Sequence, residues 1–219
     1  MPASSSIVDL RRFLQERFPR APAVLPARFS TGVAALDDAT GGGLPKNAIT
    51  ELISPRPSAG SASLIHELVR AAGGRGHFLA LVDGSDSFDA GSLGNECLRH
   101  LLWIRCRHGL EAIKVTDLLL RDGNFSLVIV DLVLNAPSEL RKIPQTTWYR
   151  LQRLVEAAPT ACLVFTQQSM VASAQLKIVL ENCWTLESLE NEAAISQLRF
   201  RIRRSHFKSE ISNQQSAIS

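Results

Sequence analysis

The sequence contains no run of about 18 consecutive apolar residues, the length that a helix needs to cross a membrane. Its N-terminal residues mix serine, arginine and acidic side chains, so they lack the apolar centre of a secretory signal. No Cys-x-x-Cys pair occurs among the four cysteines, which are Cys97, Cys106, Cys162 and Cys183. We therefore expect a cytoplasmic protein with reduced, buried cysteines and no metal site.

Length and composition are those of one folded domain. The chain has 219 residues, of which 45% are hydrophobic and 21% charged, enough to bury a sizeable core. Charge is uneven along it: residues 1–28 carry a net +3, residues 197–219 a net +4, and the segment between them a net −4. The ends are therefore basic and the core is mildly acidic.

Apolar runs of strand length alternate with segments of helical periodicity. This alternation predicts an α/β fold with a mostly parallel sheet, helices on both faces and an antiparallel edge formed by the last strands. The expected strands are 48–53, 77–82, 101–105, 127–131, 161–166, 183–189 and 198–204. The expected helices in this part of the chain are 62–72, 92–99, 110–121, 145–157 and 174–180.

The N-terminal part is expected to be an amphipathic helix joined to the core by a linker. Its apolar residues recur at a helical spacing, at Ile7, Leu10, Phe13, Leu14 and Phe18. A proline-rich stretch, 19–26, follows. We thus divide the chain into this helix and linker (1–28), a core (29–204) and a polar tail (205–219), which we expect to be disordered.

A loop of small residues follows the predicted strand 48–53. It begins at Ser54 and ends at Gly60, before a predicted helix, which is how phosphate-binding loops present backbone N–H groups to phosphates. In a working loop the last glycine precedes Lys and then Ser or Thr, but here Ser61 and Ala62 follow. The lysine for the phosphates and the hydroxyl for Mg²⁺ are both missing. An ordinary turn rich in Ser, Pro and Gly is the alternative interpretation.

An ordered series of segments resembles the ATPase core of bacterial RecA recombinases over roughly residues 29–187. The segments are Phe29-Ser30-Thr31-Gly32, Gly41-Gly42-Gly43-Leu44-Pro45, the loop at 54–61, a strand that ends at Asp83, Leu127-Val128-Ile129-Val130-Asp131, and Leu163-Val164-Phe165-Thr166-Gln167-Gln168. The resemblance implies that Asp131 takes the Walker B position and Gln168 that of the nucleotide-sensing glutamine. It places Ser85 where the family has its catalytic glutamate.

Without the loop lysine and the glutamate, we expect a degenerate nucleotide site that is not an efficient ATPase and needs no cofactor. Asp131 and Gln168 are then either functional remnants or residues that cap the core. A weak ATPase in which Lys46 or Arg56 replaces the missing lysine is an alternative.

Arginine alternates with apolar residues near the C-terminus of the core. A strand over 198–204 would place Arg199, Arg201 and Arg203 on one face, with Arg204 next to them. Either these arginines contact DNA or a partner, or they form a solvated edge that prevents aggregation.

Among RecA-related chains, this one is similar to ImuA-type proteins, through Ser30-Thr31-Gly32, Gly43-Leu44-Pro45 and Leu198-Arg199-Phe200-Arg201. The resemblance implies an accessory role in translesion DNA synthesis in the DNA-damage (SOS) response. The partners would be the RecA recombinase, a Y-family polymerase, or both, bound through Ile7, Leu10, Phe13 and Leu14. Self-association is left open. The alternative, a division inhibitor similar to SulA that binds FtsZ, fits less well because that class lacks the Ser-Thr-Gly segment and the Walker B aspartate.

Overall fold

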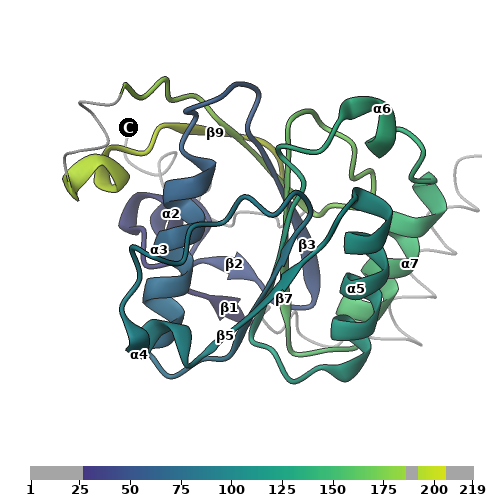
Figure 1. Cartoon of the computed structure of the whole chain (residues 1–219), viewed down its shortest axis with the longest axis horizontal. Coiled ribbons are helices and arrows are strands. Elements are labelled where there is room, and N and C mark those ends of the chain that lie inside the picture. The colour runs from purple at the N-terminus through teal and green to yellow at the C-terminus, as the bar shows by residue number, and fades with distance from the viewer. Residues whose placement is uncertain (1–26, 186–191, 206–219) are drawn as a thin grey trace, which may run out of the picture.

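A seven-stranded sheet forms the centre of the computed structural model, which describes residues 27–185 and 192–205 (Figure 1). Its strands lie in the order β5-β4-β6-β7-β3-β8-β9, and all neighbours are parallel except β8 and β9. The strands are β3 (Ala48–Ile53), β4 (Leu79–Asp83), β5 (Leu101–Arg105), β6 (Leu127–Asp131), β7 (Ala161–Thr166), β8 (Leu176–Leu180) and β9 (Phe200–Ser205). A separate antiparallel pair consists of β1 (Arg28–Phe29) and β2 (Leu44–Pro45).

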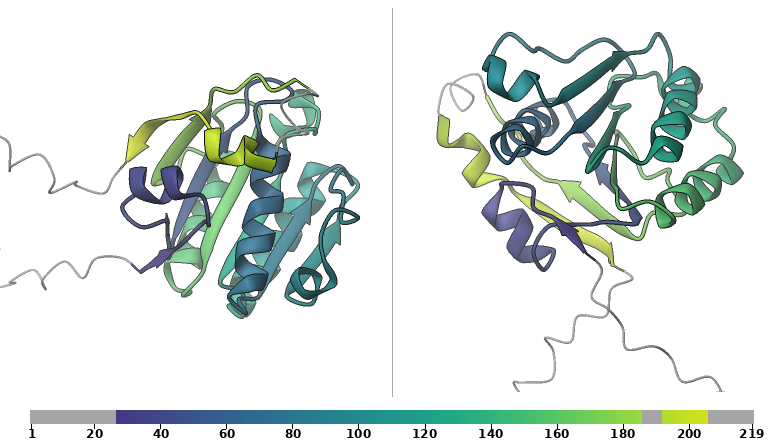
Figure 2. Two further views of the ribbon diagram at one scale, coloured as in Figure 1. Left: turned by 90° about the vertical axis from the view of Figure 1, so that its left-hand side faces the viewer. Right: turned by 90° about the horizontal axis from the view of Figure 1, so that it is seen from below.

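Helices cover both faces of this sheet (Figures 1 and 2). One face is covered by α2 (Ala34–Ala39), α3 (Ser61–Gly74) and α4 (Asn95–Leu98), and the other by α5 (Gly109–Asp122) and α7 (Gln145–Glu156). The short α6 (Pro137–Leu140) precedes α7, and a 3₁₀ helix, η1 (Glu192–Gln197), precedes β9.

The sheet separates two apolar clusters. Along β4, Leu79 and Leu81 pack in the cluster on the α3 side, whereas Ala80 and Val82 pack in the cluster on the α5 side. Successive side chains of a strand point to opposite faces, so a strand covered on both faces is apolar throughout. The continuous apolar runs of the sequence follow from this arrangement, and the predicted fold class is confirmed.

Most predicted elements are present, and four strands have the predicted bounds. The predicted helix 174–180 is wrong, because Leu176–Leu180 forms β8 and pairs in parallel with β3. Ile178 and Val179 are β-branched and fit the pleated surface of a buried strand, which outweighs the apparent helical spacing. The predicted strand 183–189 is wrong where it is described, because Cys183–Thr185 are irregular. The predicted N-terminal helix and the polar tail beyond 205 lie outside the described residues.

Candidate functional site

The loop after β3 lies at the carboxyl end of the sheet and leads directly into α3. It is tied to the neighbouring strand because the Ser54 N–H donates to the Thr166 carbonyl oxygen at 2.8 Å. Ser58 and Gly60 have left-handed backbones, with φ of 57° and 101°, and Gly60 is the N-cap of α3. The first N–H groups of a helix have no partner within the helix, and phosphate-binding loops use such groups to hold phosphates.

The side chains of this loop are small and neutral at the positions where phosphoryl transfer needs charge. Ser54 Oγ lies 3.4 Å from Ser61 Oγ, and Ala62 is exposed. Arg56 is an exposed cation within the loop. Lys46 lies two residues before β3, at the opposite end of that six-residue strand and therefore roughly 20 Å from the loop. Of the two cations considered as substitutes, only Arg56 is near the site.

Asp83 and Asp131 end the adjacent strands β4 and β6 and lie in register. The Asp83 carboxylate is fully buried and accepts the N–H groups of Ser87 and Phe88 at 2.9 Å and of Ser85 at 3.2 Å. It thus fixes the turn that follows β4, and Ser85 is held in that turn. Asp86, the residue after Ser85, forms an ion pair with Arg105 at 3.7 Å.

Asp131 has an unusual protonation equilibrium. Burial raises the pKa of its carboxyl from an ordinary 3.8 to about 6; the Val133 N–H, which donates to it at 3.0 Å, opposes this rise, and the charge of Asp83 adds to it. The carboxyl is therefore protonated over part of the range in which an exposed aspartate is fully ionised.

Replacing Asp131 by asparagine should stabilise the protein above about pH 6. Between about pH 4 and pH 6 the folded state binds more protons than the unfolded state, so stability falls as the pH rises through this window. Asparagine removes this penalty, worth about 1–3 kcal/mol, and its Oδ1 can still accept the Val133 N–H. Urea denaturation at about pH 4 and pH 7.5 measures the effect. A difference between Asp131→Asn and wild type that does not change with pH would contradict it.

A buried ion pair that sequence reasoning missed lies beside the site. Glu51, in the middle of β3, is fully buried and accepts a bond from Lys177 Nζ at 2.5 Å. Its carboxylate also accepts the N–H groups of Met170 at 2.6 Å and Val171 at 2.9 Å. These contacts fix the β7–β8 loop, in which Gln168 is exposed. The one charged residue in a mostly apolar strand is the feature of the sequence that could have indicated this ion pair.

The chain after β8 lies against the loop at 54–60. Asn182 Nδ2 donates to the Ala59 carbonyl at 3.1 Å, and the Trp184 N–H donates to the Ser58 carbonyl at 3.0 Å. A Cβ placed on Gly60 would lie only 2.9 Å from the Trp184 ring and 3.2 Å from Leu198. Glycine is therefore required at position 60 both by its left-handed backbone and by the close approach of Trp184.

The arginines near the C-terminus of the core lie in or next to β9, which begins at Phe200 and not at the predicted residue 198. Phe200 and Ile202 pack against the core, while Arg201 and Arg203 are exposed. Arg201 Nε lies 3.2 Å from Glu181 Oε1. Arg203 is an extra residue in the β8–β9 pairing, because Arg204 pairs with Lys177 and Ile202 with Ile178. Arg199 precedes β9 and is also exposed, and its N–H donates to Asn182 Oδ1 at 2.9 Å.

Nowhere in 27–185 and 192–205 do three or more His, Cys, Asp or Glu side chains gather as they would around a metal ion. Within the same ranges no helix is long and apolar enough to cross a membrane.

Comparison with known proteins identifies the family. Residues 23–141 match the family model of the RecA N-terminal domain. RecA of Rhizobium rhizogenes is 37% identical over 108 residues, which are 48% of this chain and 29% of that protein. RecA of Chlorobium chlorochromatii is 36% identical over 108 residues, and RecA of Thermotoga neapolitana 35% over 106. The matched segment spans only about 30% of the length of these relatives. Because the family model matches more than half of the chain, which also has the expected fold, the protein belongs to the RecA N-terminal domain family.

Proposed function

We propose that this protein is a non-hydrolysing RecA-like adaptor of the DNA-damage response. It supports translesion synthesis, as its resemblance to ImuA-type proteins implies, by binding the RecA recombinase, a Y-family polymerase, or both. One observation carries the proposal: the loop that leads into α3 ends at a left-handed Gly60, as the resemblance implies for a phosphate-binding loop, but Ser61 and Ala62 follow, and Trp184 packs against Gly60.

The composition of the site supports the absence of hydrolysis. Phosphoryl transfer depends on cations that stabilise the transferring group and on a residue that orients the attacking water. Neither Ser61 nor Ser85 can supply these functions. Asp86, one residue beyond the expected position of the base, has a left-handed backbone and faces Arg105. A loop that persists without its catalytic groups is consistent with a structural role, and here it binds the segment at 182–184.

Two parts of the chain are assigned to partner binding. The first is the predicted amphipathic helix with its apolar residues Ile7, Leu10, Phe13 and Leu14. The second is the exposed arginine set near β9, where Arg199 and Arg203 could contact an acidic protein surface or the DNA backbone.

The weak-ATPase alternative rests on Arg56, which is exposed and lies in the loop itself. A guanidinium in this position could reach a bound phosphate. Hydrolysis that depends on Arg56 would favour this function over the adaptor role.

Affinity purification tests the proposal. The tagged full-length protein is recovered from cells treated with a DNA-damaging agent, and bound proteins are identified by mass spectrometry. The adaptor role predicts enrichment of the recombinase or a Y-family polymerase over a tag-only control. Recovery of FtsZ instead would favour the division-inhibitor alternative, and recovery of no repair protein would overturn the proposal.

A further inference from the structure

Three exposed arginines, which we call the arginine row, lie along the last strand of the sheet. Arg201 and Arg203 belong to β9, which ends the strand order, and Arg199 directly precedes that strand. The side chain of Arg201 is 67% exposed, and Arg199 and Arg203 are exposed too. Of the acidic residues that the structure describes, none forms an ion pair with Arg199 or Arg203. Two charges of the row are therefore available to an anion from outside.

The third charge of the row takes part only in an exposed ion pair. Arg201 Nε lies 3.2 Å from Glu181 Oε1, and the Glu181 side chain is 46% exposed. Such a pair contributes little stability because both partners remain in contact with water. A phosphate can therefore replace Glu181 at Arg201 at little cost. With three arginines and one glutamate, this surface has a net charge of +2.

The backbone of the row is anchored in the core. The Arg199 N–H donates to Asn182 Oδ1 at 2.9 Å, and Asn182 is only 4% exposed. Asn182 Nδ2 donates in turn to the Ala59 carbonyl at 3.1 Å, which ties the row to the loop at 54–60. Phe200 and Ile202 pack against the apolar cluster on the α3 side of the sheet. The row thus lies on a fixed backbone, and only its side chains extend into solvent.

The spacing and the donors of the row suit a chain of phosphates. Neighbouring members are two residues apart, a step of roughly 7 Å along a strand. This step is similar to the distance between neighbouring phosphates of one nucleic acid strand. Each guanidinium presents N–H donors that can bind two phosphate oxygens at once. At Arg203 the extra residue in the β8–β9 pairing bends and twists the strand, so the row can follow a curved backbone.

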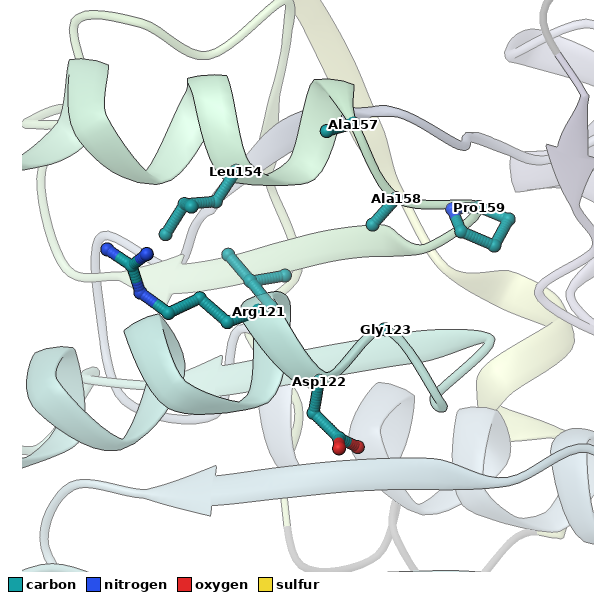
Figure 3. A pocket seen from close by; sticks show the side chains of 8 residues that line it. Arg121, Asp122, Gly123, Leu154, Ala157, Ala158 and Pro159 are labelled. Atoms are coloured by element: carbon teal, nitrogen blue, oxygen red, sulfur yellow. The ribbon is translucent and has the colours of Figure 1, made fainter.

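The surroundings of the row favour a nucleic acid over a protein. Protein interfaces have an apolar centre, but none of the large apolar side chains that the described residues expose lies on β8 or β9. An apolar groove lies instead where α5 and α7 end, and Leu154 points there from α7 toward the space above Arg121 (Figure 3). Arg121 is paired with Asp117 at 2.8 Å. The row therefore combines unpaired cations with a lack of apolar surface, as phosphate-backbone binding requires.

We infer that Arg199, Arg201 and Arg203 bind the phosphate backbone of single-stranded DNA without reading its base sequence. The row lies outside residues 23–141, the segment that matches the RecA family model. Contacts to phosphates alone position a strand and carry no sequence information. The inference rests on the proposed function only in choosing DNA over an acidic protein surface as the partner of these arginines.

Fluorescence anisotropy of a labelled oligothymidylate of about 15 nucleotides, titrated with the full-length protein, tests the inference. We expect Arg199→Ala with Arg203→Ala to weaken binding at least about tenfold. Because two phosphate contacts are lost, the slope of log affinity against log salt should become shallower by about 1.4. A mixed-sequence oligonucleotide of the same length should bind as tightly as the oligothymidylate.

The matched control is Arg99→Ala with Arg107→Ala. These exposed arginines flank β5, at the opposite end of the sheet, and their loss changes the net charge by the same amount. The control should weaken binding by less than about twofold if the contact is local. Thermal melting shows whether both double variants are folded.

Three results would overturn the inference: no binding by the wild type, equal weakening in the two folded double variants, or displacement of the DNA by polyglutamate as effectively as by unlabelled DNA of equal charge. The last result would assign the row to an acidic polypeptide. Binding that is salt-sensitive and weakened only in the Arg199 and Arg203 variant supports it. Failure to recover a recombinase or polymerase in the affinity purification concerns the adaptor function alone, because this titration contains no partner protein.

Discussion

Replacing Lys177 by methionine is expected to lower the free energy of unfolding by about 3–5 kcal/mol. Methionine keeps much of the apolar stem but leaves the fully buried Glu51 carboxylate without its ion-pair partner. In a domain of this size such a loss lowers the melting temperature by roughly 10 °C. Guanidinium denaturation monitored by circular dichroism measures the difference.

The matched control is Arg121→Met, which breaks the ion pair of an exposed arginine with Asp117 and should leave the free energy of unfolding nearly unchanged. The double variant Glu51→Gln with Lys177→Met should recover part of the loss, because the buried charge is then absent. A loss below about 1 kcal/mol for Lys177→Met would show that the pair does not hold β3, β8 and the β7–β8 loop together.

Turnover of ATP by the purified protein is expected to be at least about 1,000-fold slower than that of a RecA protein with an intact loop. The proposal places Ser61 where the family has the lysine that contacts the phosphates, and Ser85 where it has the general base. Removing one charge-stabilising group of this kind typically costs a factor of about 100–1,000 in rate. Phosphate release, followed at saturating ATP with and without single-stranded DNA, measures the rate.

Arg56→Ala is the control for this measurement. The adaptor account expects its rate to equal the low rate of wild type. Hydrolysis well above background that disappears in Arg56→Ala would contradict the account and establish Arg56 as the substitute cation.

The sequence predicts correctly those strands whose local apolar pattern agrees with their place in the sheet. The runs that became β3, β5, β6 and β7 are apolar, short and bounded by turn residues, so they were placed at their observed bounds. The helix predicted for 174–180 is wrong because the spacing of apolar residues in this segment fits a helix as well as a strand. The segment forms a strand because it pairs with β3 on one side and with β9 on the other.

The candidate site was predicted less completely because it depends on contacts between distant residues. The loop at 54–60, Asp131 and Gln168 could be located from the sequence because each lies at the end of an apolar run. Trp184 and Gly60 are in contact although more than a hundred residues separate them in the sequence. The sequence around neither residue indicates this contact. The sequence shows Glu51 as an acidic residue within a predicted strand. Its partner Lys177 lies in the segment wrongly predicted to be a helix, so the ion pair could not be predicted.

A binding titration with purified proteins tests the central claim most directly. Full-length protein and a variant without residues 1–20 are each titrated with RecA recombinase and with a Y-family polymerase, and thermal melting confirms that both are folded. The account predicts saturable binding of at least one partner by the full-length protein and its loss in the folded deletion variant. Failure of the full-length protein to bind either partner, or equal binding by the two forms, would contradict it.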